Sequence, residues 1–211
     1  YQAGYSTSVG ASLTAVGYLA LKSSTAGNST AVGYRALTSQ TSQDSSTAVG
    51  VDAAYSTTTG YYIDAFGHQS LRANTTGIAN SGFGTWTLLN NSTGSYNTAV
   101  GSSALYSNTT ASNNTAVGYQ AAYTNTTGSE TTAFGAYALW LNTTGNYNTA
   151  VGSQALKLNT ASTNTAVGYQ AGYTNSVGTG NVYLGQQAGY GATGSNNEMR
   201  LFPEGVTKES K

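Results

Sequence analysis

The sequence predicts an all-β protein, a β-solenoid of 16–17-residue repeats, and three observations predict it. A glycine recurs at an almost constant interval, with an apolar residue before it and a small residue three positions after it. The same polar turn recurs between these glycines. No stretch carries the sustained 3.6-residue apolar period of an amphipathic helix. The repeat glycines are Gly17, Gly33, Gly50, Gly67, Gly84, Gly101, Gly118, Gly135, Gly152, Gly168 and Gly185.

The three residues before each repeat glycine are predicted to form a short strand. In repeats such as 98–100 and 149–151 they read Thr-Ala-Val, so large and small side chains alternate with the period of two that a strand requires. The residue next to the glycine is Val, Phe or Leu in every repeat. The glycine itself is predicted to need a positive φ or a close backbone approach.

A second short strand and a second turn are predicted after the glycine. Ala stands three positions after most repeat glycines, Leu often follows it, and an aromatic residue often comes next, as in 104–106. Asn-Thr-Thr-Gly sequences at 74–77, 125–128 and 142–145 supply the turn. Each coil would therefore add one rung to two parallel sheets, and twelve rungs about 4.8 Å apart would form a rod of roughly 55 Å.

One face of the first strand is expected to meet another chain. Val or Phe and Ala or Gly point to opposite sides of that strand. If Val and Phe fill the interior, a flat Ala and Gly face without charge lies outside; if Ala lies inside, Val and Phe are exposed. A closed cyclic oligomer would bury either face, and the alternative is a wide monomeric solenoid whose turns cover it.

The composition argues against several functional classes. Charged residues make up 7% of the chain, against about 25% in an ordinary domain. A net charge of zero removes the electrostatic basis for binding nucleic acid, and no apolar run is long enough for membrane insertion. With one histidine and no cysteine, no metal and no cofactor are expected. No nucleophile, base and orienting group recur together, so the chain is not expected to be an enzyme.

Two stretches carry a family resemblance. Residues 114–123 read Asn-Thr-Ala-Val-Gly-Tyr-Gln-Ala-Ala-Tyr, and residues 164–173 repeat them with one change. They resemble the head repeats of trimeric autotransporter adhesins and, more closely, the repeats of bacteriophage tail fibres and related bacterial surface fibres. Adhesin heads usually have shorter repeats. The resemblance implies a left-handed parallel β-roll, three chains side by side, and a role as a fibre shaft or adhesive head.

Two segments are predicted. Residues 1–197 form the β-roll repeat array, which begins in mid-repeat because 1–5 matches 169–173. Residues 198–211 form a charged C-terminal cap or exit segment. Leu201 still occupies the Val position of the repeat, and Pro203 is expected to end the sheet because proline cannot join a central ladder.

The least regular repeats, 61–90, contain the candidate receptor contacts His68, Arg72 and Trp86. Exposed aromatic rings beside polar groups can cover the apolar face of a sugar, although freely varying loops of a repeat array would look the same. The tyrosines after the Leu position are predicted to stack as a spine. They are Tyr55, Tyr106, Tyr123, Tyr173 and Tyr190.

Two further residue types are not expected to form sites. Asp44, Asp52 and Asp64 occupy different positions of the repeat, which argues against a calcium site. Asn-x-Ser/Thr sequences, as at Asn74 and Asn108, are expected to be turn residues.

The predicted function is that of a non-catalytic, homotrimeric segment of an extracellular fibre, either a virion tail fibre or a bacterial surface adhesin. It would act as a rigid spacer with multivalent binding to a cell-surface glycan or protein receptor. One alternative is a subunit of a self-assembling extracellular filament. Another is an ice-binding β-solenoid, which the regular Thr positions favour and the lack of a Thr-x-Thr array disfavours.

Overall fold

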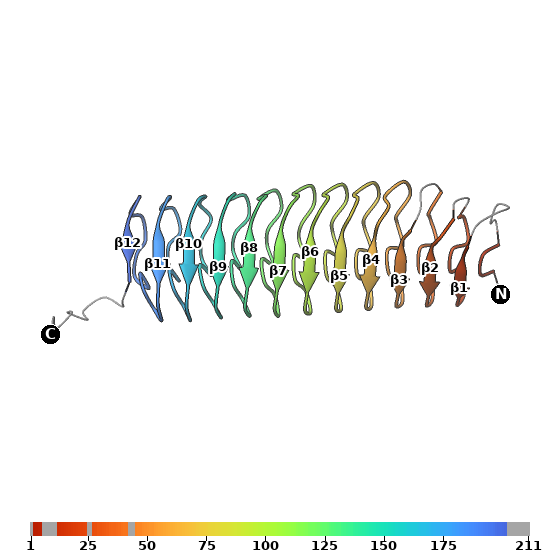
Figure 1. The fold of residues 1–211 in the computed structure, drawn as a ribbon, viewed down its shortest axis with the longest axis horizontal. Helices are drawn as coiled ribbons and strands as arrows, with labels where there is room; N and C mark the ends of the chain where they lie inside the picture. Colours follow the sequence, from red (N-terminus) through yellow and green to blue (C-terminus); the bar gives the residue numbers. More distant parts are fainter. Residues whose placement is uncertain (1, 6–11, 25–26, 42–44, 202–211) are drawn as a thin grey trace.

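A computed structural model describes residues 2–5, 12–24, 27–41 and 45–201. Those residues form twelve short strands that follow one another along a rod, from β1 at one end to β12 at the other (Figure 1). The strands are β1 (Thr14–Val16), β2 (Thr30–Val32), β3 (Thr47–Val49), β4 (Asp64–Phe66), β5 (Ser81–Phe83), β6 (Thr98–Val100), β7 (Thr115–Val117), β8 (Thr132–Phe134), β9 (Thr149–Val151), β10 (Thr165–Val167), β11 (Val182–Leu184) and β12 (Met199–Arg200).

Every strand pairs in parallel with its neighbour in the sequence, and equivalent repeat positions lie opposite each other. In β6 and β7, for example, Thr98 pairs with Thr115 and Val100 with Val117. A parallel strand must be reached by a crossover, and here the crossover is the rest of the coil. The predicted parallel β-solenoid, with each strand directly before its repeat glycine, is therefore confirmed.

The prediction of a second strand in each coil, and thus of a second sheet, is wrong for the described residues. After the glycine of the β6 coil, Ser103 and Leu105 have φ values of 58° and 51°, so this stretch is a turn and not an extended strand. It still bonds to other coils, because Leu105 N–H donates to the Ala121 carbonyl at 3.0 Å. Leu and Ser rarely adopt the left-handed region, so the sequence gives little sign of this turn.

The small side chains of the strands face the interior. Ala99 and its equivalents in most strands are fully buried, together with the Ala and Leu that follow the glycine, such as Ala104 and Leu105. Of the two orientations left open by the sequence, the structure has Ala inside and Val or Phe outside. Most buried apolar side chains are alanines, so a coil with Leu at its usual position has no room for Val or Phe from the strand.

The repeat glycines meet both conditions expected of them. Gly118 has a φ of 133°, and a Cβ on it would lie 2.7 Å from the carbonyl carbon and oxygen of Gly135 in the next coil. The equivalent glycines along the rod have φ values from 114° to 139°. Backbone therefore packs directly on backbone at this corner of every coil, where any side chain would clash.

Two columns of buried asparagines run along the interior, and neither is among the predictions from the sequence. The turn Asn column comprises Asn74, Asn91, Asn108, Asn125, Asn142, Asn159 and Asn175, which are fully buried. Within it, the Asn108 amide donates to Asn91 Oδ1 at 2.7 Å and to the Ala111 carbonyl at 3.0 Å. Asn125 donates in turn to Asn108 Oδ1 at 3.2 Å. Turn chemistry explains asparagine at these positions equally well, so only its regular recurrence pointed to a ladder.

The strand Asn column lies directly before the strands and consists of Asn80, Asn97, Asn114, Asn148, Asn164 and Asn181. Each side-chain oxygen accepts a backbone N–H from the next coil, as Asn97 Oδ1 does from Asn114 at 3.1 Å. Its amide donates to the turn of the following coil, as Asn97 does to the Ala111 carbonyl at 2.9 Å. The two columns thus satisfy buried backbone groups that no strand pairs.

The last described coils depart from the repeat in a coordinated way. Tyr183 stands where most other strands have Ala, and it is fully buried. Gly172 and Gly189 occupy the Leu position of the two coils against it, and a Cβ on either would lie within 2.5 Å of the Tyr183 ring. The ring therefore fills the space that two absent side chains leave.

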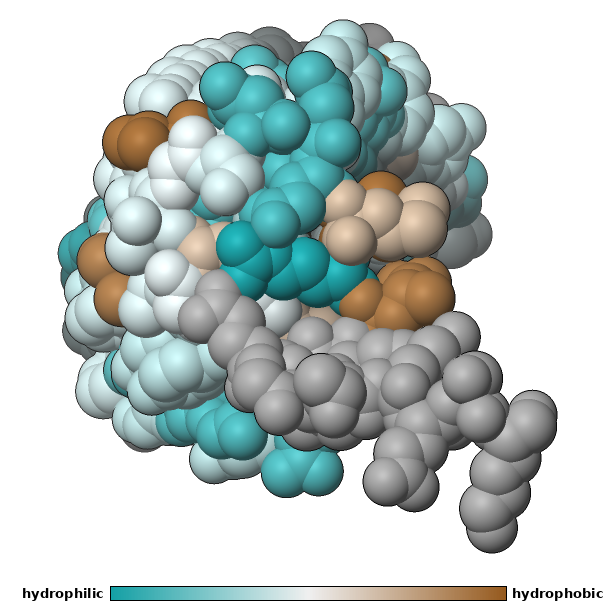
Figure 2. All heavy atoms as spheres, turned by 90° about the vertical axis from the view of Figure 1, so that its left-hand side faces the viewer, coloured by the Kyte–Doolittle hydropathy of each residue, from teal (hydrophilic) through white to brown (hydrophobic). Residues whose placement is uncertain are grey.

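The C-terminal end of the described rod carries charge over the interior columns. Glu198 occupies the next position along the strand Asn column, and Arg200 occupies the next position along the column of inward Ala residues. The two side chains form an ion pair at 2.6 Å. This ion pair lowers the pKa of Glu198. Viewed along the rod, hydrophilic residues occupy the middle of this end, while hydrophobic residues form separate patches (Figure 2). β12 thus adds a rung within the predicted cap, and Pro203 lies outside the described residues.

Candidate functional site

Four side chains of each coil point outward on the side of the sheet. In the β6 coil, Tyr96, Thr98 and Val100 are exposed, while Asn97 and Ala99 between them are fully buried. The residue directly after the glycine continues this alternation. We call the resulting surface the sheet face. It has four columns: a pre-strand column five residues before each repeat glycine, the Thr and Val columns of the strands, and a post-strand column one residue after the glycine.

The sheet face combines exposed apolar and aromatic side chains with uncharged polar ones and is almost without charge. The exposed fractions of Val16, Phe134 and Tyr96 are 57%, 55% and 58%. Among the described residues of the four columns, Asp64 and Glu130 are the only charged side chains. The rings of Phe66 and Phe83 stack at 5.1 Å along the Val column. Of the five described cations, Lys22, Arg35, Arg72 and Lys157 lie on the opposite side of the repeat glycine, in the turn that follows it, and Arg200 occupies an inward position of β12.

The structure brings together two of the three candidate receptor contacts. His68 lies in the post-strand column, and its ring centroid is 6.2 Å from that of Trp86 in the next coil, in an edge arrangement. The Trp86 indole N–H donates to Gln69 Oε1 at 3.2 Å, and the side chain stays 42% exposed. Part of the side chain can therefore still be reached from solvent beside polar groups.

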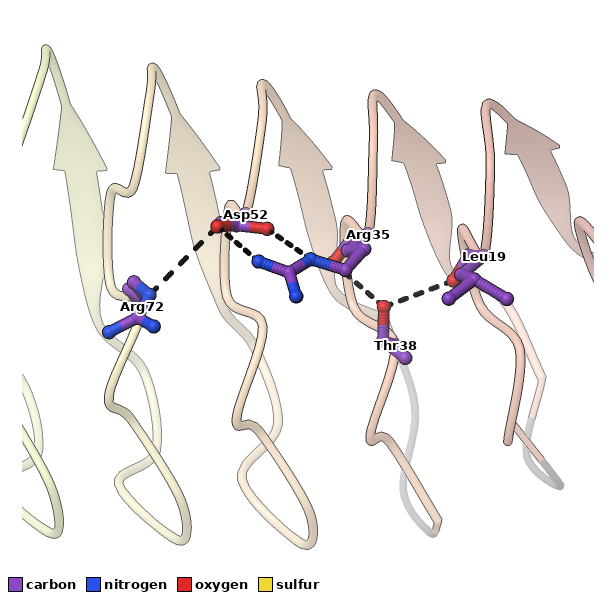
Figure 3. Close-up of polar contacts among 5 residues, drawn as sticks. All are labelled: Leu19, Arg35, Thr38, Asp52 and Arg72. Atoms are coloured by element: carbon purple, nitrogen blue, oxygen red, sulfur yellow. Dashed lines mark hydrogen bonds and ion pairs between the residues drawn. The ribbon is translucent and has the colours of Figure 1, made fainter.

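Arg72, the third candidate, belongs to a separate ionic cluster (Figure 3). Arg35 forms two hydrogen bonds of 2.8 Å with the carboxylate of the nearly buried Asp52, and Arg72 Nε lies 4.0 Å from the same carboxylate. The hydrogen bond to Asp52 holds the pKa of Arg35 above its usual value. The Tyr55 ring lies under both guanidinium groups, at 4.7 Å from Arg35 and 6.0 Å from Arg72.

The predicted aromatic spine is confirmed over two stretches of the turn. Tyr106 and Tyr123 stack at 5.0 Å, and Trp140 extends the stack at 6.2 Å from Tyr123. Tyr173 and Tyr190 form the second stretch. Lys157 lies between the two stretches, with Nζ 5.7 Å from the Trp140 ring and 5.5 Å from Tyr173. Neighbours cover the ring faces inside each stack, so these rings are poorly placed to stack on a sugar.

The structure places two of the three aspartates and the Asn-x-Ser/Thr residues in different parts of the coil. Asp52 is held by arginines and Asp64 lies on the sheet face, while Asp44 is outside the described residues. No group of potential metal ligands occurs in the described coils, and no pocket is present there. No helix in the described part of the chain could cross a membrane. The side chains of Asn74 and Asn108 are fully buried in the turn Asn column.

The chain was compared with protein-family models, with curated proteins and with solved structures. No match was found in any of the three comparisons. Functional inference for this chain therefore rests on the sheet face, the Trp86 surface and the arginine cluster.

Proposed function

We propose that this chain is a non-catalytic structural and adhesive segment of an extracellular fibre, a phage tail fibre or bacterial surface adhesin, in which three copies associate side by side. The observation that carries the proposal is the sheet face, which exposes Val, Phe and Tyr side chains along the whole described rod with almost no charge. Surfaces that meet another chain are depleted in charged residues and enriched in aromatic ones at their centre. An apolar strip of this length is unusual on a monomer.

Three-fold association fits a surface that runs along one side of a straight rod. Rotation about an axis parallel to the rod brings each sheet face to the centre, and the ring closes without leaving an apolar face free. The left-handed sense and the number of three follow from the adhesin and tail-fibre resemblance. The solenoid supplies stiffness, because each coil is bonded to its neighbours along the rod.

The surfaces away from the sheet face would stay accessible in such a fibre. Trp86 is partly exposed and has polar neighbours, and Arg72 is a half-exposed cation beside the Tyr55 ring. We propose Trp86 and Arg72 as contacts for a glycan or protein receptor. His68, the third candidate, packs against Trp86 but lies at the edge of the sheet face, where a neighbouring copy would cover it. Three copies per fibre would raise a weak affinity through effective concentration.

A charge on the sheet face tests this proposal. Phe134→Lys would bring three ammonium groups together near the fibre axis, so the mass measured by light scattering should fall from about three times 21.5 kDa toward 21.5 kDa. Phe134 is 55% exposed in the single chain, so the coil itself should tolerate the change. Thr110→Lys, on an exposed turn outside the sheet face, is the matched control and should leave the mass unchanged. An unchanged mass for both variants would contradict the proposed interface.

Ice binding is the second candidate, and it receives less support. The outward positions of most strands are Thr and Val. They form two regular columns, and successive residues within each column are about 4.8 Å apart along the rod. Phe66, Phe83 and Phe134 interrupt the Val column, however, and no second Thr column accompanies the first on the strands. An ice-recrystallisation assay separates the two functions.

A further inference from the structure

The two outer columns of the sheet face differ in which coils carry their tyrosines. In the post-strand column, tyrosine occurs in the coils of β1, β2, β7 and β10; in the pre-strand column, it occurs in the coils of β4, β6 and β9. No coil from β1 to β11 has tyrosine in both columns. The post-strand tyrosines are Tyr18, Tyr34, Tyr119 and Tyr169, and the pre-strand tyrosines are Tyr62, Tyr96 and Tyr147.

The residue at the other edge of each of these coils is small or polar. Opposite the post-strand tyrosines stand Ser12, Asn28, Asn113 and Thr163, and opposite the pre-strand tyrosines stand His68, Ser102 and Ser153. His68 is the largest of these residues. A large side chain at one edge of a coil is thus accompanied by a smaller one at the other.

Packing within one chain does not explain this pattern. The two positions of a coil are six residues apart, on either side of an extended strand, so their Cα atoms are separated by roughly 15–20 Å. The pre-strand tyrosines also adopt a costly backbone conformation, because Tyr62, Tyr96 and Tyr147 have φ values of 55° to 59°. They are 58–59% exposed, so burial in the single chain does not offset that cost.

We infer that the pre-strand edge of one copy lies against the post-strand edge of the next copy, with the chains parallel and equivalent coils at the same level. This inference rests on the proposed side-by-side fibre and specifies its register. We call the line along which two such edges meet the seam. Each coil level of the seam then has at most one tyrosine, and the smaller residue opposite leaves room for it. Around a three-fold axis each copy provides both edges, so the same seam occurs three times.

Engineered disulfides test the register, because the chain has no cysteine. Glu130→Cys and Ala136→Cys occupy the two edges of the β8 coil and are too far apart to bond within one chain. If equivalent coils meet, the oxidised double variant should run as a covalent trimer in denaturing electrophoresis. Glu130→Cys with Ser102→Cys is the control, since Ser102 lies two coils away, at about 9.6 Å along the rod, beyond the reach of a disulfide.

The outcomes separate this inference from the proposed function. Cross-linking of the out-of-register control would overturn the register, and cross-linking of Glu130→Cys alone would overturn the pairing of unlike edges. A native mass of three chains without any cross-link would refute the edge pairing and leave the trimer intact. A native mass of one chain would instead overturn the proposed function.

Added tyrosines provide a second test that needs no oxidation. Ser102→Tyr would place a ring at the level of the partner's Tyr96, so it should weaken association at least tenfold. Thr85→Tyr, whose seam neighbour would be the partner's Ala79, should leave association within about threefold of the unmodified chain. Equal effects of the two substitutions would overturn the inference.

Discussion

Single residues in this solenoid are governed by close contacts between adjacent coils. Tyr183 is the clearest case, because its buried ring occupies the space left by glycines in the two adjoining turns. In most other coils Leu or Ala occupies the position of these glycines, and the strand has Ala at the position of Tyr183. A change in side-chain volume on either side of this contact should therefore lower the free energy of unfolding.

Gly189→Ala should lower the free energy of unfolding by about 1–3 kcal/mol, the usual range for overpacking. Its Cβ would lie 2.2 Å from Tyr183 Cδ1, and the φ of 64° adds strain. Gly194→Ala is the control, because its Cβ would meet only Val177 at an ordinary 3.5 Å. Urea unfolding measures both, and an equal cost of Gly189→Ala in a Tyr183→Ala background would contradict the assigned contact.

Tyr183 also predicts a loss of stability at high pH. Burial raises the pKa of its phenol to about 12, and no hydrogen-bond partner for the hydroxyl occurs among the described residues. The unfolded chain ionises near pH 10, before the folded one, so stability should fall as the pH rises from about 10 to 12. Tyr183→Phe should lose less stability than the unmodified chain over that range in thermal unfolding. Parallel curves for the two proteins would contradict the assignment.

At the scale of the repeating element, the turn Asn column holds the coils together where strands do not. Asn108→Ala would remove an amide that donates twice and an oxygen that accepts once. Each buried group left without a partner costs about 1–3 kcal/mol, so the total loss should be about 2–4 kcal/mol after relaxation.

The matched control for this substitution is Asn90→Ala, because Asn90 is an exposed asparagine of the neighbouring coil. The free energy of unfolding of the Asn90→Ala variant should stay within about 0.5 kcal/mol of that of the unmodified chain, as for most surface changes. Guanidinium unfolding followed by circular dichroism measures both variants. A small effect at Asn108 would mean that water replaces its partners and that the ladder is not a stabilising element.

The sequence predicted the strands, their parallel order and the repeat glycines, since these depend on a period of two and on the special freedom of glycine. It did not predict the turn that replaces the second strand, because residues such as Leu105 adopt a conformation that their chemistry disfavours. The sheet face was only half predicted. Alternation placed Val and Ala on opposite sides, but only the narrow interior of the whole coil decides that Ala99 lies inside.

At the scale of the whole molecule, the distribution of charge and apolar surface divides the rod. The sheet face lacks cations along all described coils, whereas the turns after the repeat glycine carry the arginine cluster and the aromatic spine. One side is therefore suited to contact with another copy of the chain, and the other to contact with solvent or a receptor. The candidate residues His68 and Trp86 lie at the corner between the two sides.

Receptor binding belongs to this scale, because it depends on several copies acting together. Trp86→Ala should reduce binding of the assembled fibre segment to a glycan array at least tenfold, since loss of one weak contact is repeated in each copy. Tyr190→Ala, which removes the last ring of the aromatic spine, is the control and should bind unchanged. Equal binding by both variants would exclude the Trp86 surface as a contact site.

The central claim is that the sheet face is covered by two further copies of the chain. Light scattering of the purified segment over a hundredfold range of concentration tests it most directly. The account predicts a mass of about three times 21.5 kDa throughout that range. A mass of 21.5 kDa at every concentration would contradict it, leave the solenoid fold in place, and make ice recrystallisation the next function to test.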